Sequence, residues 1–219
     1  AKYLLYSPLP AVYRIHEYPE LKRVNEAIKA INELGKRIRP LRELDNPIAL
    51  QKIQKMLQDD EDYQILSTIL LRFMKRARYS VENMGHFALS LDAYTHFTSP
   101  IRRYPDLQIH RIIKDNLRGR MNESKIEHYQ SLLPEVAKRS SEMERRADEA
   151  ERETIKLKKT EYMQAHIGEE FDGVISGITK WGMYVELPNT IEGLVHVTNM
   201  TDDHYEYNEE RYEMIGMHT

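Results

Sequence analysis

Arginines, aromatic residues and histidines alternate through one 29-residue block of this chain, GHFALSLDAYTHFTSPIRRYPDLQIHRII, at 85–113. The guanidinium group of arginine is a planar fork of donors that matches two phosphate oxygens, so Arg102 and Arg103 are candidate phosphate ligands. A base gains about 1–3 kcal/mol by stacking on an aromatic ring, whatever its identity. Aromatic residues near the two arginines are therefore candidate stacking surfaces, and they are Tyr94, Phe97 and Tyr104.

The two arginines must be positioned by the break in the middle of the block. A serine followed by a proline at 99–100 is typical of a helix N-terminus, although Pro105 favours a start a few residues later. In both cases Arg102 lies near backbone N–H groups that also attract phosphate. A structural alternative stays open, in which this is a buried helix start and the arginines pair with Asp92 or Asp106.

The pattern G-H-F-A-L-x-L-x-x-Y-x-H-F-T-S-P-I-R-R-Y-x-D-L-x-x-H-R resembles the signature of the ribonuclease II and ribonuclease R family. Members of that family are processive exoribonucleases that hydrolyse single-stranded RNA from the 3′ end. The segment PAVYRIHEYP at 10–19 and the later segment SEMERRADEAERE also resemble family segments. From Ile167 the chain resembles an RNA-binding barrel of the ribosomal-protein S-one type. The resemblance covers nearly all of the chain.

The resemblance implies an α+β chain in two parts. Residues 1–165 would form the mainly helical C-terminal part of the catalytic domain. Residues 166–219 would form the N-terminal part of an OB-fold barrel, truncated at its end. Alternating apolar residues and glycines predict three strands in this second part, around 171–175, 183–187 and 194–197.

Apolar residues recur at helical spacing through most of the first part. Helices are expected from Leu21 to Leu34, over 63–78 and over 106–117. A longer helix carries a seam of mostly small residues at spacings of three and four, namely Val136, Ser140, Met143, Ala147, Ala150, Thr154 and Leu157. Because small residues let helices approach closely, we expect this seam to pack against the domain body.

Two positions take functional roles from the resemblance. Arg102 matches the family's arginine that contacts RNA near the scissile phosphate, and Glu151 matches an acidic residue that lines the RNA channel. Glu151 would equally suit a helix-surface ion pair with Arg146 or Lys156.

The S-one-type barrel binds RNA with aromatic residues on its second and third strands. The positions that match in this chain are Trp181, Tyr184 and His196. Together they would form a stacking surface that accepts any base. The alternative is that Trp181 and Tyr184 pack against the nuclease domain.

The resemblance also implies magnesium, which the family holds with four closely spaced aspartates in the N-terminal half of the nuclease domain. This sequence lacks that cluster, so no metal ligand is expected in it. The acidic runs at 59–62 and 202–203 lie outside the matching motifs and are expected to be solvated loops or helix starts. The intact enzyme would use magnesium, and this part alone would be inactive.

Composition narrows the class of protein. There is no cysteine, which excludes a disulfide framework and a cysteine nucleophile. No apolar run approaches the roughly 20 residues that span a bilayer. We therefore expect a cytoplasmic protein that does not bind a membrane. The family resemblance implies single-stranded RNA as its partner, and we expect a monomer that associates with the missing N-terminal part.

Charge is uneven along the chain. The formal net charge is −3 overall, but it is +1 over 1–70, +6 over 71–160 and −10 over 161–219. The basic excess around the signature favours a path for a phosphate backbone. The acidity of the last segment has no explanation in RNA binding.

Two other classes of function stay open. One is a noncatalytic RNA-binding module, which would bind RNA without hydrolysing it. The other is a helical interaction protein, in which the seam of small residues mediates dimerisation and the arginines are structural.

Overall fold

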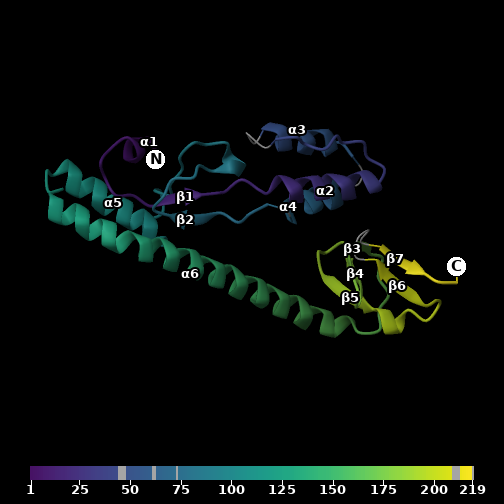
Figure 1. Cartoon of the computed structure of the whole chain (residues 1–219). Helices are drawn as coiled ribbons and strands as arrows, with labels where there is room; N and C mark the ends of the chain where they lie inside the picture. Colours follow the sequence, from purple (N-terminus) through teal and green to yellow (C-terminus); the bar gives the residue numbers. More distant parts are fainter. Residues whose placement is uncertain (44–47, 61–62, 73, 209–212, 219) are drawn as a thin grey trace. The chain divides into compact units, whose positions relative to one another are not determined.

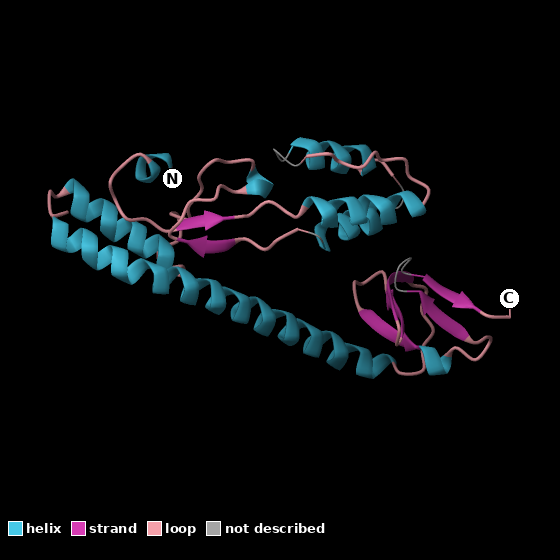
Figure 2. Ribbon diagram, in the orientation of Figure 1, coloured by secondary structure: helices cyan, strands magenta, loops and turns pink. Residues whose placement is uncertain are grey.

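The computed structural model describes residues 1–43, 48–60, 63–72, 74–208 and 213–218. The backbone divides into two compact units, one formed by 1–32 and 36–150 and the other by 33–35 and 151–219. The first unit is mainly helical, whereas the second holds most of the strands (Figure 2). The mixed α+β class expected from the sequence is confirmed.

A hairpin of two helices and a pair of short strands form one core of the first unit (Figure 1). The helices are α5 (Tyr104–Leu117) and α6 (Glu123–Met163), and β1 (Tyr13–Ile15) pairs antiparallel with β2 (Arg78–Ser80). Apolar side chains at helical spacing face each other across the hairpin. The fully or almost fully buried ones are Ile15, Ile109, Ile112 and Leu133.

Three helices form a second core in the same unit. They are α2 (Leu21–Glu33), α3 (Ile48–Leu57) and α4 (Tyr63–Arg72). The predicted helix at Leu21 is confirmed, and it ends just before Gly35, whose φ of +86° suits glycine. The predicted helix over 63–78 ends earlier than expected, because 78–80 pair with β1 as a strand. Two short helices complete the unit, α1 (Lys2–Leu5) and η1 (Phe87–Leu89).

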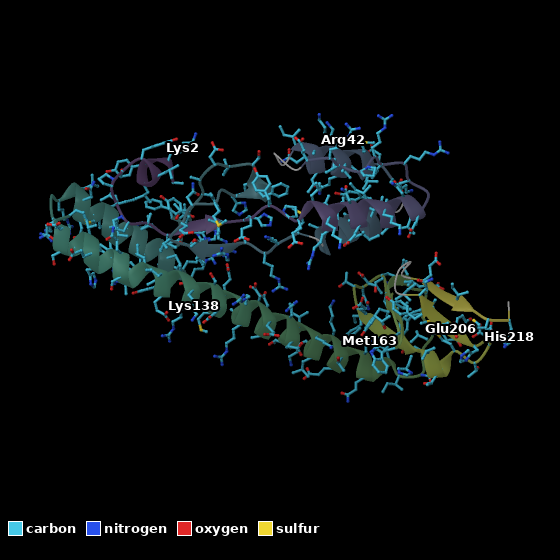
Figure 3. The ribbon with its side chains drawn as sticks, in the orientation of Figure 1. Lys2, Arg42, Lys138, Met163, Glu206 and His218 are labelled. Carbon is cyan, nitrogen blue, oxygen red and sulfur yellow. The ribbon has the colours of Figure 1, made fainter. Side chains whose placement is uncertain are left out.

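The seam of small residues on α6 packs only at its start. Val136 is buried, but Met143 is 46% exposed and Leu157 is 56% exposed. Within the first unit, the expected packing against the domain body is therefore confirmed at Val136 and wrong at Met143. The helix also carries exposed basic side chains such as Lys138 (Figure 3).

The second unit contains five strands within the described residues. β3 (Val174–Thr179), β4 (Gly182–Glu186) and β5 (Glu192–His196) form an antiparallel sheet in that order. The three predicted strands correspond to β3, β4 and β5, and the first of them lies later in the sequence than the expected 171–175. β6 (Tyr205–Asn208) and β7 (Glu213–Gly216) form a further antiparallel pair, and β7 contacts β3. The sequence did not predict this pair, because YEYN and EMIG carry little apolar alternation. The helical turns are η2 (Gln164–His166) and η3 (Val197–Asn199).

None of the helices in the described ranges has an apolar stretch long enough to cross a bilayer.

Candidate nucleic-acid interface

Arg102 lies in a tight turn directly before α5. The carbonyl oxygen of Ser99 accepts the backbone N–H groups of Arg102 at 3.3 Å and of Arg103 at 3.0 Å. The later proline sets the helix start, since α5 begins at Tyr104 with Pro105 in its first turn. The Arg102 side chain is exposed and makes no hydrogen bond or ion pair with any described residue. Its guanidinium group is therefore available to an external anion.

Arg103 has a different environment from its neighbour. Its Nε and Nη2 atoms donate to Oδ2 of Asp106 at 3.2 and 2.8 Å, and the Asp106 side chain is fully buried. The same oxygen accepts the N–H of Ser99 at 2.8 Å. The alternative in which the arginines pair with a nearby aspartate is thus observed for Arg103, which pairs with Asp106. A direct contact of Arg103 with RNA stays a prediction.

Two exposed aromatic rings flank the turn in sequence. Phe97 is 44% exposed and stacks on His110, with 4.2 Å between ring centroids and 18° between planes. Tyr104 is 49% exposed, and its hydroxyl oxygen accepts the amide of Gln108 at 2.5 Å. Both rings are held from one side and leave surface for a base to stack on.

Tyr94 is packed more closely than these two rings. It lies edge-on between His86 at 5.3 Å and His96 at 5.6 Å, and its carbonyl accepts the N–H of Arg14 at 2.9 Å. Tyr94 therefore joins the signature loop to β1. Its assignment as an RNA-binding residue stays a prediction.

A tyrosine–histidine pair lies behind the loop. The hydroxyl of Tyr79 is 2.8 Å from Nδ1 of His96. Burial, together with the positive charges of Arg103 and Arg14, lowers the pKa of His96 to about 4. Burial and the charge of Glu144 raise the pKa of Tyr79 to about 12. At neutral pH the phenol and the imidazole are therefore both uncharged, and the tautomer of His96 sets which of the two donates.

Arg14 connects this pair to α6. Its guanidinium carbon lies 4.8 Å from the centroid of the Tyr79 ring, and its Nη1 atom is 2.6 Å from Oε2 of Glu144. Sequence reasoning did not single out Arg14, Tyr79 or Glu144, because they are distant in sequence. The β1–β2 pairing places Arg14 opposite Tyr79, and α6 brings Glu144 to Arg14.

The basic residues that precede the signature are partly used inside the protein. Lys75 and Arg78 both pair with Glu17, at 3.2 and 2.5 Å, and these hydrogen bonds lower the pKa of Glu17. By contrast, the basic residues at the end of the signature and after it are exposed, namely Arg111, Lys114, Arg118 and Arg120.

The three barrel residues predicted to bind RNA occupy two kinds of position. Trp181 lies in the β3–β4 turn rather than on a strand, is 58% exposed and has Lys180 Nζ 4.9 Å from its ring centroid. Tyr184 is on β4, two residues after Gly182, and Gly182 is the register partner of His196 on β5. Because side chains alternate along a strand, Tyr184 and His196 share one face of the sheet.

Glu151 is exposed on α6 and belongs to the second unit. It makes no hydrogen bond or ion pair with any described residue, so the alternative pairing with Arg146 or Lys156 is not observed. Its place in an RNA channel stays a prediction.

No group of three or more histidine or acidic residues in the described ranges is arranged to hold a metal ion. Asp60 pairs with Lys36 at 2.6 Å, and Asp202 accepts the hydroxyl of Tyr205 at 2.7 Å. Residues 61–62 of the first acidic run lie outside the described residues. The magnesium implied by the family resemblance therefore does not fit the side chains that this structure describes.

Comparison with known families now identifies the architecture. A model described as RNB domain matches residues 1–119, which is more than half of the chain. The chain belongs to the RNB family, the family of ribonuclease R. A second model, described as S1 RNA binding domain, matches residues 164–214. The resemblance found in the sequence is thus confirmed.

Curated RNB relatives match the chain over only part of their own length. Ribonuclease R 1 of Lactococcus lactis is 44% identical over 208 residues, which cover 95% of this chain and 26% of that protein. Ribonuclease R of Thermotoga maritima is 43% identical, with 95% and 29% covered. The chain thus spans between a quarter and a third of the length of these relatives.

Solved RNB structures have the same fold. Mycoplasma genitalium RNase R in its apo form matches with a TM-score of 0.92 and 29% identity, over 100% of this chain and 35% of that chain. The same protein has been solved in complex with ribose methylated single-stranded RNA and matches with a TM-score of 0.91. Yeast Ssd1, a pseudonuclease, matches over 85% of this chain and 23% of that chain, with a TM-score of 0.63 and 24% identity, which shows the fold alone.

Proposed function

We propose that this RNB chain binds single-stranded RNA as the C-terminal part of a nuclease that hydrolyses RNA from the 3′ end. The observation that carries the proposal is the Arg102 guanidinium, exposed and unpaired among the described residues, at a turn inside the RNB match. The RNA complex of the similar Mycoplasma genitalium RNase R supports it. A cytoplasmic location and a monomeric state belong to the same proposal.

Each group has a separate role in this proposal. Arg102 grips a phosphate through two parallel hydrogen bonds and offsets negative charge that develops on it. Phe97 and Tyr104 offer stacking surfaces beside that phosphate. In the second unit, Trp181 and the face shared by Tyr184 and His196 bind further nucleotides without base selectivity. Glu151 lines the path of the RNA.

Magnesium is the proposed metal of the longer enzyme. Because the described residues bring no metal-ligand cluster together, its ligands would come from outside them. We therefore assign to these residues the binding and orientation of RNA, and no step that passes through the metal.

A noncatalytic RNA-binding module is the second candidate. The fold does not decide against it, because the same fold occurs in yeast Ssd1, which is described as a pseudonuclease. The two candidates differ in whether the longer protein hydrolyses RNA.

The first experiment is an incubation of this chain with 5′-labelled single-stranded RNA and magnesium, resolved on native and denaturing gels. We expect a mobility shift with intact RNA, and a weaker shift for Arg102→Ala. Arg39→Ala is the matched control, because Arg39 is also exposed but lies outside the signature block and the basic residues next to it. A ladder of products descending from the 3′ end would contradict the placement of the metal site. No shift at any RNA concentration would contradict RNA binding.

A further inference from the structure

The turn that carries Arg102 is fixed by a buried carboxylate. Oδ2 of Asp106 accepts three donors, namely the N–H of Ser99 and the Nε and Nη2 groups of Arg103. The carbonyl of Ser99 in turn accepts the N–H groups of Arg102 and Arg103. Ser99 is therefore held through both its N–H and its C=O groups, and the backbone of Arg102 is held through Ser99.

The ion pair between Asp106 and Arg103 is largely buried. Asp106 is 0% exposed, and the Arg103 side chain is 20% exposed. A buried carboxylate must keep its partners, because removing one leaves an uncompensated charge. Its other oxygen, Oδ1, has no hydrogen-bond partner among the described residues. The carboxylate therefore makes its hydrogen bonds to Ser99 and Arg103 through Oδ2 alone, among the described residues.

We propose that Asp106 and Arg103 are positioning residues: their buried ion pair anchors Ser99 and so fixes the turn that presents Arg102 to an RNA phosphate. This rests on the proposed function, in which Arg102 binds that phosphate. The two adjacent arginines then have different roles: Arg102 binds the RNA phosphate, and Arg103 holds the turn through Asp106.

The sign of the effect of Asp106→Asn separates positioning from simple electrostatics. Removing a negative charge near an RNA-binding site raises RNA affinity if charge alone matters. If the ion pair positions Arg102, the same substitution lowers RNA affinity. Asp92→Asn is the matched control, because Asp92 lies in the same block with an exposed side chain. It loses the same charge without touching the turn.

The binding experiment uses this chain and a 5′-fluorescein single-stranded oligonucleotide, followed by fluorescence anisotropy. We expect Arg102→Ala to weaken RNA binding about tenfold or more. Asp106→Asn should weaken RNA binding by most of the same factor, and Asp92→Asn should not weaken it. The double variant Arg102→Ala/Asp106→Asn should bind no more weakly than Arg102→Ala. Additive losses, or tighter binding by Asp106→Asn, would overturn the proposal.

Arg103→Met covers the case in which Asp106→Asn does not fold. If Arg103 acts only through the turn, its loss and that of Arg102 are not additive, and the double variant keeps the salt dependence of Arg102→Ala. If Arg103 itself contacts a phosphate, the losses add and the salt dependence becomes shallower still. That second result would overturn its role as a positioning residue.

A measurement without RNA tests the anchor separately from the proposed function. Amide hydrogen exchange followed by NMR should show faster exchange at Ser99, Arg102 and Arg103 in the Asp106→Asn chain, with Ile109 and Ile112 unchanged. Equal exchange at Ser99 in variant and parent would overturn the anchor. If the anchor is present but the parent binds no RNA, the proposed function is what has failed, and the role of the turn toward RNA fails with it.

Discussion

At the scale of single residues, the chemistry proposed for this chain depends on one guanidinium group. Arg102 is exposed without a partner among the described residues, so its positive charge is not already neutralised inside the protein. We expect Arg102→Ala in the longer enzyme to lower turnover roughly a hundredfold or more, since one preorganised donor to a developing charge is worth about 2.7–4 kcal/mol. Steady-state kinetics on single-stranded RNA would measure it.

Arg102→Lys is the informative companion to that substitution. It keeps the charge but not the planar fork of donors, so we expect turnover between those of the parent and Arg102→Ala. RNA binding should change less than turnover in both variants. Unchanged turnover in Arg102→Ala would remove Arg102 from the proposed mechanism.

His96 gives the first unit a pH dependence with a defined sign. Its pKa is about 4 in the folded chain against an ordinary value of 6.5, so the unfolded chain binds more protons between these values. The contribution of His96 to the free energy of unfolding is complete above about pH 6.5 and is lost as the pH falls toward 4. After allowing for solvent that reaches the half-buried ring, we expect it to be roughly 1–2 kcal/mol.

His96→Asn would show this contribution, because an asparagine keeps an acceptor for the Tyr79 hydroxyl but does not titrate in this range. The free energy of unfolding, measured in urea at pH 7 and pH 4.5, should differ less between the two pH values in His96→Asn than in the parent. His128→Asn serves as the control at an exposed position. An equal pH dependence in parent and His96→Asn would disprove the assignment.

At the scale of elements, the β3–β4 turn that displays Trp181 depends on one glycine. Gly182 has φ +140°, and a Cβ atom there would lie 2.1 Å from the carbonyl oxygen of Val195. We expect Gly182→Ala to destabilise the second unit by at least about 1 kcal/mol. Gly177→Ala in the same sheet should change stability by less than about 0.5 kcal/mol, because its Cβ would meet nothing within 4 Å. Urea midpoints would compare them.

The elements also show what sequence patterns can predict. Helical periodicity located α2 and α5, because local spacing of apolar residues determines which helix face is buried. It did not locate β1 and β2, which are three residues long and depend on a partner more than 60 residues away. It also missed β6, because that short strand has little apolar alternation and depends on its pairing with β7.

The candidate site shows the same division. Residue types and spacing were enough to select Arg102, Phe97 and Tyr104 as candidates. They were not enough to separate Arg102 from Arg103, because that difference depends on which side chain reaches the buried Asp106. A first-turn acidic residue three positions after an arginine was the signal available in the sequence.

At the scale of the whole molecule, burial is distributed as unevenly as charge. Among the described residues, every buried apolar side chain lies between Leu4 and Ala137, within the first unit. The second unit also carries the acidic excess, with 2 basic and 12 acidic residues over 161–219, including Glu206 on β6 (Figure 3). A small core and self-repulsion both reduce its stability.

We therefore expect the second unit to unfold first. Trp181 is the single tryptophan of the chain and lies in this unit, whereas most helical residues lie in the first. The urea midpoint of tryptophan fluorescence should be lower than the midpoint of circular dichroism at 222 nm. Coincident midpoints would mean that both units unfold together.

Single-stranded RNA should bring the two midpoints closer together if the second unit binds it. A ligand that binds only the folded state stabilises it by about 2.7 kcal/mol at one hundred times its Kd. We expect saturating RNA to raise the fluorescence midpoint more than the dichroism midpoint, because the unit with less stability of its own gains the larger fraction. Inorganic phosphate at the same charge concentration is the control, and it should move neither. A rise in the dichroism midpoint alone would place RNA binding in the first unit, where Arg102 lies, and would leave Trp181, Tyr184 and His196 without a role in it.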